Sequence, residues 1–188
     1  MVLSQSDAAA ALSDIHAAAD QSRAYTHYRH ASSHLLLWGT LWLVSGVVSD
    51  IAPQSAGSAW MVADTIGAIG SVMIGRSMAR KDSDRVTAAR RTSRVLTSMA
   101  AYVVFAVAAM VLMHPTSAAQ ATTFFALLIG ALYVGVGVWI GIRYVIIGSA
   151  VAALSAAIYW LHLPHASAMI SIVGGGSLLI GGFWMRRA

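Results

Sequence analysis

Six uninterrupted apolar runs constrain the fold of this chain more than any other feature. Each run is about 17 to 21 residues long, so at about 1.5 Å per residue a helix can cross a hydrocarbon core of roughly 30 Å. Lipid offers no hydrogen-bond partner to backbone groups, which makes helices the only suitable form for such runs. The runs cover 35–51, 59–75, 95–113, 122–142, 144–161 and 168–184. We therefore expect an all-α polytopic membrane protein with six transmembrane helices.

The composition also indicates a lipid environment. Of the 188 residues, 58% are hydrophobic and only 10% are charged, whereas about a quarter of the residues in a typical soluble domain are charged. The absence of cysteine excludes disulfides, thiolate metal sites and cysteine nucleophiles. The sequence also lacks a nucleophile elbow, a phosphate-binding loop and an HExxH zinc motif. We therefore expect a membrane protein that is not an enzyme.

The basic residues predict how the chain is oriented in the membrane. They lie before the first run, between the second and third, between the fourth and fifth, and at the C-terminus, whereas the connections around Pro53, Pro115 and Pro164 contain none. The positive-inside rule then places both termini in the cytoplasm and the three proline turns outside. Nothing before Leu35 resembles the apolar core of a cleavable signal peptide. We expect a multi-pass protein of the bacterial inner membrane.

Seven of the twelve basic residues fall between residues 76 and 94. We expect this segment to be a cytoplasmic loop that attracts anionic lipid headgroups, to which each nearby Lys or Arg contributes about 1 kcal/mol. Nucleic-acid binding is not expected, because the segment has no aromatic residue and Asp82 and Asp84 dilute its charge. The candidate headgroup-binding residues are Arg76, Arg80, Lys81, Arg85, Arg90, Arg91 and Arg94.

A repeated pattern divides the chain into three tandem hairpins. Each outer turn has a proline, followed by small polar residues and a glycine-rich apolar stretch that ends at arginine, as in "PTSAAQATTFFALLIGALYVGVGVWIGIR" and "PHASAMISIVGGGSLLIGGFWMRRA". We expect a cytoplasmic amphipathic helix at 1–33, followed by a bundle at 34–188 with parallel hairpin repeats at 34–76, 94–143 and 144–188. The pattern resembles the HdeD-like family of small bacterial inner-membrane proteins, and this resemblance implies a role in acid stress.

Small residues recur at every fourth position within the runs. This spacing lets helix backbones approach closely in lipid, so we interpret it as packing rather than as the lining of a pore. Glycine-lined faces left over after the bundle has formed would also permit a homo-oligomer. The clearest series is Ala63, Gly67, Ser71 and Gly75, and Gly137 forms a GxxxG pair with Gly141.

Asp64 lies about one and a half turns into the second run. An ionised carboxylate near the membrane centre costs roughly 2.5 to 3.5 kcal/mol, which makes Asp64 a candidate for a proton or cation path. It follows Ala63 in the small-residue series, so we expect it to face the bundle rather than lipid. The alternative is a structural carboxyl that stays protonated or bonds a hydroxyl such as Ser45 or Thr65. Asp50, at the outer end of the first run, either joins the path or marks the interface.

Histidines and methionines gather around the outer turns, in "MVLMHP" and "HLPHASAM". Imidazole and thioether are copper ligands, and imidazole with carboxylate suits zinc. With the aspartates, the histidines could instead form a titratable outer vestibule, because imidazole changes charge between about pH 5 and 8. The structural alternative is interfacial capping by the histidines and gap filling by the methionines. The candidate residues are His114, His162, His165, Met110, Met113 and Met169.

The segment before the first run is rich in alanine and follows a serine cap, so we expect it to be helical. At about 100° per residue, its histidines fall on one narrow face. The spacing of His27, His30 and His34 suits an arm that responds to pH or to a metal. The simpler interpretation is the solvated side of an interfacial helix.

Three functional hypotheses follow from these features. The first is conduction or sensing of protons or small cations through a polar outer cavity, with Asp64 as the titratable residue. The second is a membrane-anchored regulatory protein whose N-terminal helix and basic segment dock a cytoplasmic protein partner. The third is binding of copper or zinc at the outer face, apart from which no cofactor is expected.

Overall fold

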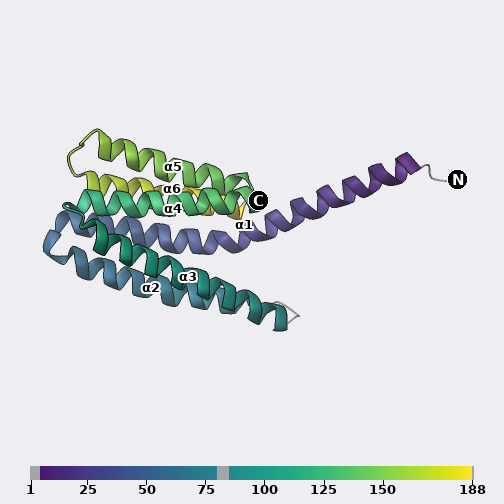
Figure 1. Ribbon diagram of the computed structural model, residues 1–188, viewed down its shortest axis with the longest axis horizontal. Helices are drawn as coiled ribbons and strands as arrows, with labels where there is room; N and C mark the ends of the chain where they lie inside the picture. The colour runs from purple at the N-terminus through teal and green to yellow at the C-terminus, as the bar shows by residue number, and fades with distance from the viewer. Residues whose placement is uncertain (1–4, 80–84, 188) are drawn as a thin grey trace.

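Every described element of the chain is helical, as the apolar runs predict. The computed structural model describes residues 5–79 and 85–187. The helices run up and down in an elongated bundle, and the three connections that contain proline lie at one end of it (Figure 1). We call this end the proline end and the opposite end the arginine end. The elements are α1 (Gln5–Ile51), the short helix η1 (Pro53–Ser55), α2 (Ala56–Ala79), α3 (Arg85–Met113), α4 (Ala118–Ile140), α5 (Ile142–Trp160) and α6 (Ala166–Arg186).

Five stretches in the described residues are long and apolar enough to cross a membrane. They have between 19 and 25 residues each. The apolar part of α3, Thr97–Met113, is shorter than all of them. The structure therefore supports a membrane protein, while the sixth span at 95–113 stays a prediction. The five stretches are Ala31–Ile51, Pro53–Ser77, Ala118–Ile140, Ile142–Trp160 and Ala166–Arg186.

Helix α1 is the longest element and joins two segments that we expected to be separate. It has 47 residues, which corresponds to a length of about 70 Å. Its N-terminal half projects past the arginine end of the bundle (Figure 1). No break marks the expected boundary between residues 33 and 34, because the alanine-rich segment favours helix and leads directly into the first apolar run.

The basic segment at 76–94 is helical over most of its length, contrary to the expected loop. Helix α2 continues to Ala79 and α3 begins at Arg85, because the alanines and arginines after residue 84 are good helix formers. Arg80 and Lys81 lie outside the described residues. Arg76 on α2 is exposed, as is Arg94 on α3, which also carries Arg85, Arg90 and Arg91.

The closest packing joins helices that belong to different predicted hairpins. Helix α1 packs most extensively against α6, and α4 against α5. A Cβ on Gly175 would lie 2.7 Å from the carbonyl oxygen of Gly39, and a Cβ on Gly130 would lie 2.8 Å from that of Gly148. No side chain fits at either contact, so glycine is required there. The predicted three-hairpin repeat is not confirmed by this packing.

The hydrophobic core lies among α1, α4, α5 and α6. Helix α6 contacts each of the other three, whereas α3 has only sparse contact with α2. Helix α2 is attached to α1, chiefly through Trp38, whose Nε1 donates a hydrogen bond to Ser71 Oγ at 3.0 Å. The most deeply buried apolar side chains, each less than 2% exposed, are Leu35, Ala126, Val151, Ile170, Leu178 and Met185.

Candidate functional site at the proline end

The three histidines near the proline end all occupy turns with a left-handed backbone. His114 follows α3, and His162 and His165 lie in the connection between α5 and α6, with φ angles of 43°, 50° and 54°. Histidine is among the few non-glycine residue types that are enriched in this region. Turn geometry is therefore one reason why histidine suits these positions.

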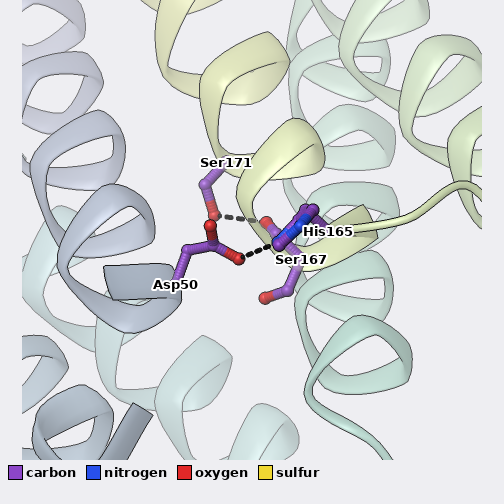
Figure 2. Close-up of polar contacts among 4 residues, drawn as sticks. All are labelled: Asp50, His165, Ser167 and Ser171. Atoms are coloured by element: carbon purple, nitrogen blue, oxygen red, sulfur yellow. Dashed lines mark hydrogen bonds and ion pairs between the residues drawn. The ribbon is translucent and has the colours of Figure 1, made fainter. Parts of the chain in front are cut away.

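His165 additionally contacts another helix. Its Nδ1 lies 2.9 Å from Oδ1 of Asp50, near the end of α1 (Figure 2). The contact spans 115 residues of sequence and links α1 to the start of α6. The imidazole is 71% exposed and the Asp50 side chain 35% exposed, so the pair lies at the surface of the bundle. Protonation of the imidazole converts this hydrogen bond into an ion pair with the carboxylate.

Two serines of α6, Ser167 and Ser171, lie beside this pair, and Ser171 Oγ donates to the Ser167 carbonyl at 2.9 Å (Figure 2). Ser167 Oγ also lies 3.0 Å from Thr122 Oγ1 on α4. The Ser171 side chain fills the place that a Cβ on Gly46 of α1 would take. Three helices thus meet in one set of polar residues. We call Asp50, Thr122, His165, Ser167 and Ser171 the proline-end cluster.

The predicted metal site receives no support from this arrangement. His162 turns back on the end of α5, with Nδ1 2.8 Å from the Trp160 carbonyl oxygen. In the described part of the chain, no three His, Cys, Asp or Glu side chains form a group that could hold a metal ion. Met113 and Met169 are exposed, and Met110 is half-buried on α3.

Asp64 lies on α2, apart from the proline-end cluster. The small-residue series beside it faces α1, because the Trp38 ring covers Gly67, where a Cβ would lie 2.5 Å from Cη2. Asp64 itself is exposed, and its carboxylate has no hydrogen bond or ion pair among the described residues. The expectation that Asp64 faces the bundle rather than lipid stays a prediction, since its exposed side chain lies within electrostatic range of Tyr102 on α3. One step along a helix turns a side chain by about 100°, so Asp64 does not share the face of Ala63 that packs against α1.

The arginine end holds a contact that sequence reasoning missed. Arg143 lies in the first turn of α5 rather than in a connection, and its Nη1 donates to the Trp184 carbonyl at 2.9 Å. Its Cζ lies 4.9 Å from the Trp184 ring centroid and 5.1 Å from that of Tyr28. Cation–π attraction and the negative end of α6 both favour a guanidinium here. The sequence offered one signal for this contact: Arg143 directly follows the fourth apolar run, and Trp184 is the last residue of the sixth.

Beside this contact, Gly141 alone connects α4 to α5. Its φ of 153° favours glycine, and the hydroxyl of Tyr28 fills the place of its missing Cβ. The predicted histidine stripe lies nearby on α1. His34 is half-buried within the apolar stretch Ala31–Ile51, and the side chains of His27 and His30 lie outside the described residues. The sensing role of this stripe stays a prediction.

No family model, curated protein or solved structure matches this chain. The likeness to HdeD-like proteins therefore remains one of pattern. Inference about function has to start from residues that the fold brings together across distant parts of the sequence. Among the described residues, the proline-end cluster is such a group, with an exposed titratable pair at its surface.

Proposed function

We propose that this chain is a non-enzymatic membrane protein that responds to proton concentration outside a bacterial cell through the proline-end cluster. In this proposal six helices cross the inner membrane, the third through Thr97–Met113. Both termini are cytoplasmic, because the connections at the proline end carry no lysine or arginine. The observation that carries the proposal is the 2.9 Å contact between Asp50 and His165, which links α1 to α6.

The chemistry of the pair of Asp50 and His165 suits a sensor of pH better than a contact that holds the fold together. Imidazole changes charge between about pH 5 and 8, so acidification adds charge attraction to the existing hydrogen bond. Exposed ion pairs contribute only about 0.2 to 1 kcal/mol. A contribution of about 1 kcal/mol biases a two-state equilibrium roughly fivefold, which is enough to signal but too little to hold the bundle together. No third His, Asp or Glu among the described residues forms a group with the pair.

The test compares two histidines of the same turn. Spin labels at the exposed positions Ile51 and Ile172 report the separation of α1 and α6 in liposomes. We expect acidification from about pH 8 to 5 to shorten and narrow this distance in the wild-type protein. The response should disappear in His165→Gln and in Asp50→Asn. It should persist in His162→Gln, because the His162 ring bonds the adjacent end of α5 and not α1.

Two outcomes would reject the proposal: a wild-type distance that does not change with pH, or a response that survives in His165→Gln. Proton and cation flux through the same liposomes should be recorded in parallel. Flux that is lost in Asp50→Asn would extend the proposal from sensing to conduction. Flux equal to that of protein-free liposomes would confine it to sensing.

A second candidate function rests on the projecting half of α1. Leu12 and Ile15 are exposed there, three residues apart and thus on one helix face. Exposed apolar faces of this kind are typical of binding surfaces, and we propose that this face docks a cytoplasmic protein. Deletion of residues 1–24 keeps Tyr28 against Arg143 and should abolish co-purification of that protein without changing the unfolding temperature. Undiminished co-purification would refute docking through α1.

A further inference from the structure

The hydroxyl of Ser155 is buried in the bundle without a hydrogen-bond partner. Ser155 on α5 is 0% exposed, and its Oγ has no partner among the described residues. The buried hydroxyls of Thr123 and Ser171 donate to carbonyl groups four residues earlier on their own helices, at 2.7 and 2.9 Å. Ser155 departs from this pattern. A buried hydroxyl without a partner loses its hydration and gains nothing in return, which is rare in native structures.

The packing of α4 against α5 places Thr123 level with Ser155. Gly130 of α4 lies against Gly148 of α5, and the two helices are antiparallel. Thr123 on α4 and Ser155 on α5 each lie seven residues, or about two helical turns, closer to the proline end than these glycines. Both residues are buried, so both lie within the bundle at this level.

Helix α6 contributes Ser171 close to the same level. Ile147 of α5 fills the place of a Cβ on Gly181 of α6. These helices are also antiparallel, so about eight residues further towards the proline end Ser155 lies level with Val173. Ser171 precedes Val173 by about half a turn, is 0% exposed and belongs to the proline-end cluster. Ser171 therefore lies near the depth of Ser155, but its side chain packs against Gly46 of α1, which leaves Thr123 as the facing hydroxyl.

We propose that a water molecule binds at Ser155, between α4 and α5, and connects this hydroxyl to Thr123. The proton of Thr123 is used in a bond to its own helix, but its oxygen atom retains acceptor capacity. A bound water can accept from Ser155 and donate to Thr123 Oγ1, which supplies two of the two to four polar partners that it needs. Ala126, buried on α4 near the same level, brings only a methyl group to the site.

The proposed water extends the polar region from the surface into the core. Ser155 lies five residues before Trp160, the last residue of α5, or about 8 Å along the helix axis. Thr123 follows Thr122 of the proline-end cluster on α4, so polar groups would then continue from the cluster to Ser155. The proposed water site does not require the protein to respond to pH. An experiment can therefore reject this site without rejecting the proposed function, and the reverse.

Radiolytic hydroxyl-radical labelling of the intact protein in lipid nanodiscs tests the site, because a water bound inside the protein generates radicals at its own position. Val151 and Ile158 are buried, lie on the same face of α5 as Ser155 and should be oxidised in the wild-type protein. We expect this oxidation to be lost in Ser155→Ala. It should persist in Ser49→Ala, because Ser49 Oγ already bonds the Ser45 carbonyl on its own helix, and in His165→Gln.

Thermal unfolding of the same variants provides a second measurement that works even where labelling is weak. Removing the hydroxyl from a bound water takes away one of its partners, so Ser155→Ala should lower the unfolding temperature. If no water is present, the substitution removes a costly unpaired group and should raise it. A raised unfolding temperature, or wild-type labelling equal to that of Ser155→Ala, would overturn the proposal.

Discussion

Two regions of this bundle use small residues in different ways. Between α1 and α6 the backbones themselves touch, at Gly39 and Gly175, whereas α2 receives the ring of Trp38 on Gly67. The difference extends to burial, since 44% of the apolar stretch of α6 is buried inside the protein but only 11% of that of α2. Helix α3 is attached even more sparsely. The same spacing of small residues therefore predicts that another helix packs closely, but it does not predict whether a backbone or a side chain makes the contact.

The division also separates the polar residues. The proline-end cluster is built on α1, α4, α6 and the residue just before α6, all in the closely packed region. Asp64 lies on α2, in the loosely attached region. Close packing holds side chains in defined geometry, and Asp50 and His165 are within hydrogen-bond distance as a result. A function of the cluster should accordingly be separable from any function of Asp64.

The largest effect should come from a side chain inserted between α1 and α6. In Gly175→Leu the new Cβ would lie 2.7 Å from the Gly39 carbonyl oxygen and 2.9 Å from the Leu43 backbone nitrogen. These are backbone atoms, which cannot rotate away as a flexible side chain can. We expect the free energy of unfolding to fall by about 3 kcal/mol, the upper part of the range for overpacked cores. Denaturant unfolding in detergent micelles measures this change.

Gly75→Leu on α2 is the matched control, because nothing lies within 4 Å of a Cβ at Gly75. Both substitutions replace glycine by leucine within a helix and gain the same helix propensity. The difference between their free energies of unfolding therefore measures the effect of packing at Gly175. We expect Gly75→Leu to change the free energy of unfolding by no more than about 0.5 kcal/mol in the unfavourable direction. If Gly75→Leu lowered the free energy of unfolding as much as Gly175→Leu, α2 would not be the more loosely packed helix, and another surface would have to cover it.

The sequence predicted helices but not their partners. Run length and hydrophobicity are local properties, so they located the apolar parts of the helices. Which helices pack together depends on contacts between distant residues, such as Gly39 with Gly175, and no local pattern encodes them. The continuity of α1 across residue 33 was also missed. Its start was interpreted as a separate element, although nothing in the sequence there terminates a helix.

The candidate site was predicted only as separate residues. Asp50 and His165 were both candidates, but for different roles, because 115 residues separate them and no motif joins them. Ser155 gave no signal, since a serine within an apolar run usually bonds its own helix. Asp64 was assigned to the packed side because its neighbours are small. A helix presents adjacent residues to different surroundings, so small neighbours alone could not say that Asp64 lies near Tyr102 on α3 rather than against α1.

The smallest effect should come from Asp64→Asn, which tests whether the loosely attached region is as independent as its packing suggests. Asp64 is exposed and has no hydrogen bond or ion pair among the described residues, and its electrostatic neighbour Tyr102 belongs to the sparsely packed α3. We expect the free energy of unfolding to change by less than about 0.5 kcal/mol. The distance between α1 and α6 should keep its dependence on pH.

A loss above about 1 kcal/mol would reveal a hydrogen-bond partner for the carboxylate. A lost pH response would place α2 in the sensing mechanism and remove the functional division, because Asp64 would then act on a cluster that it does not touch.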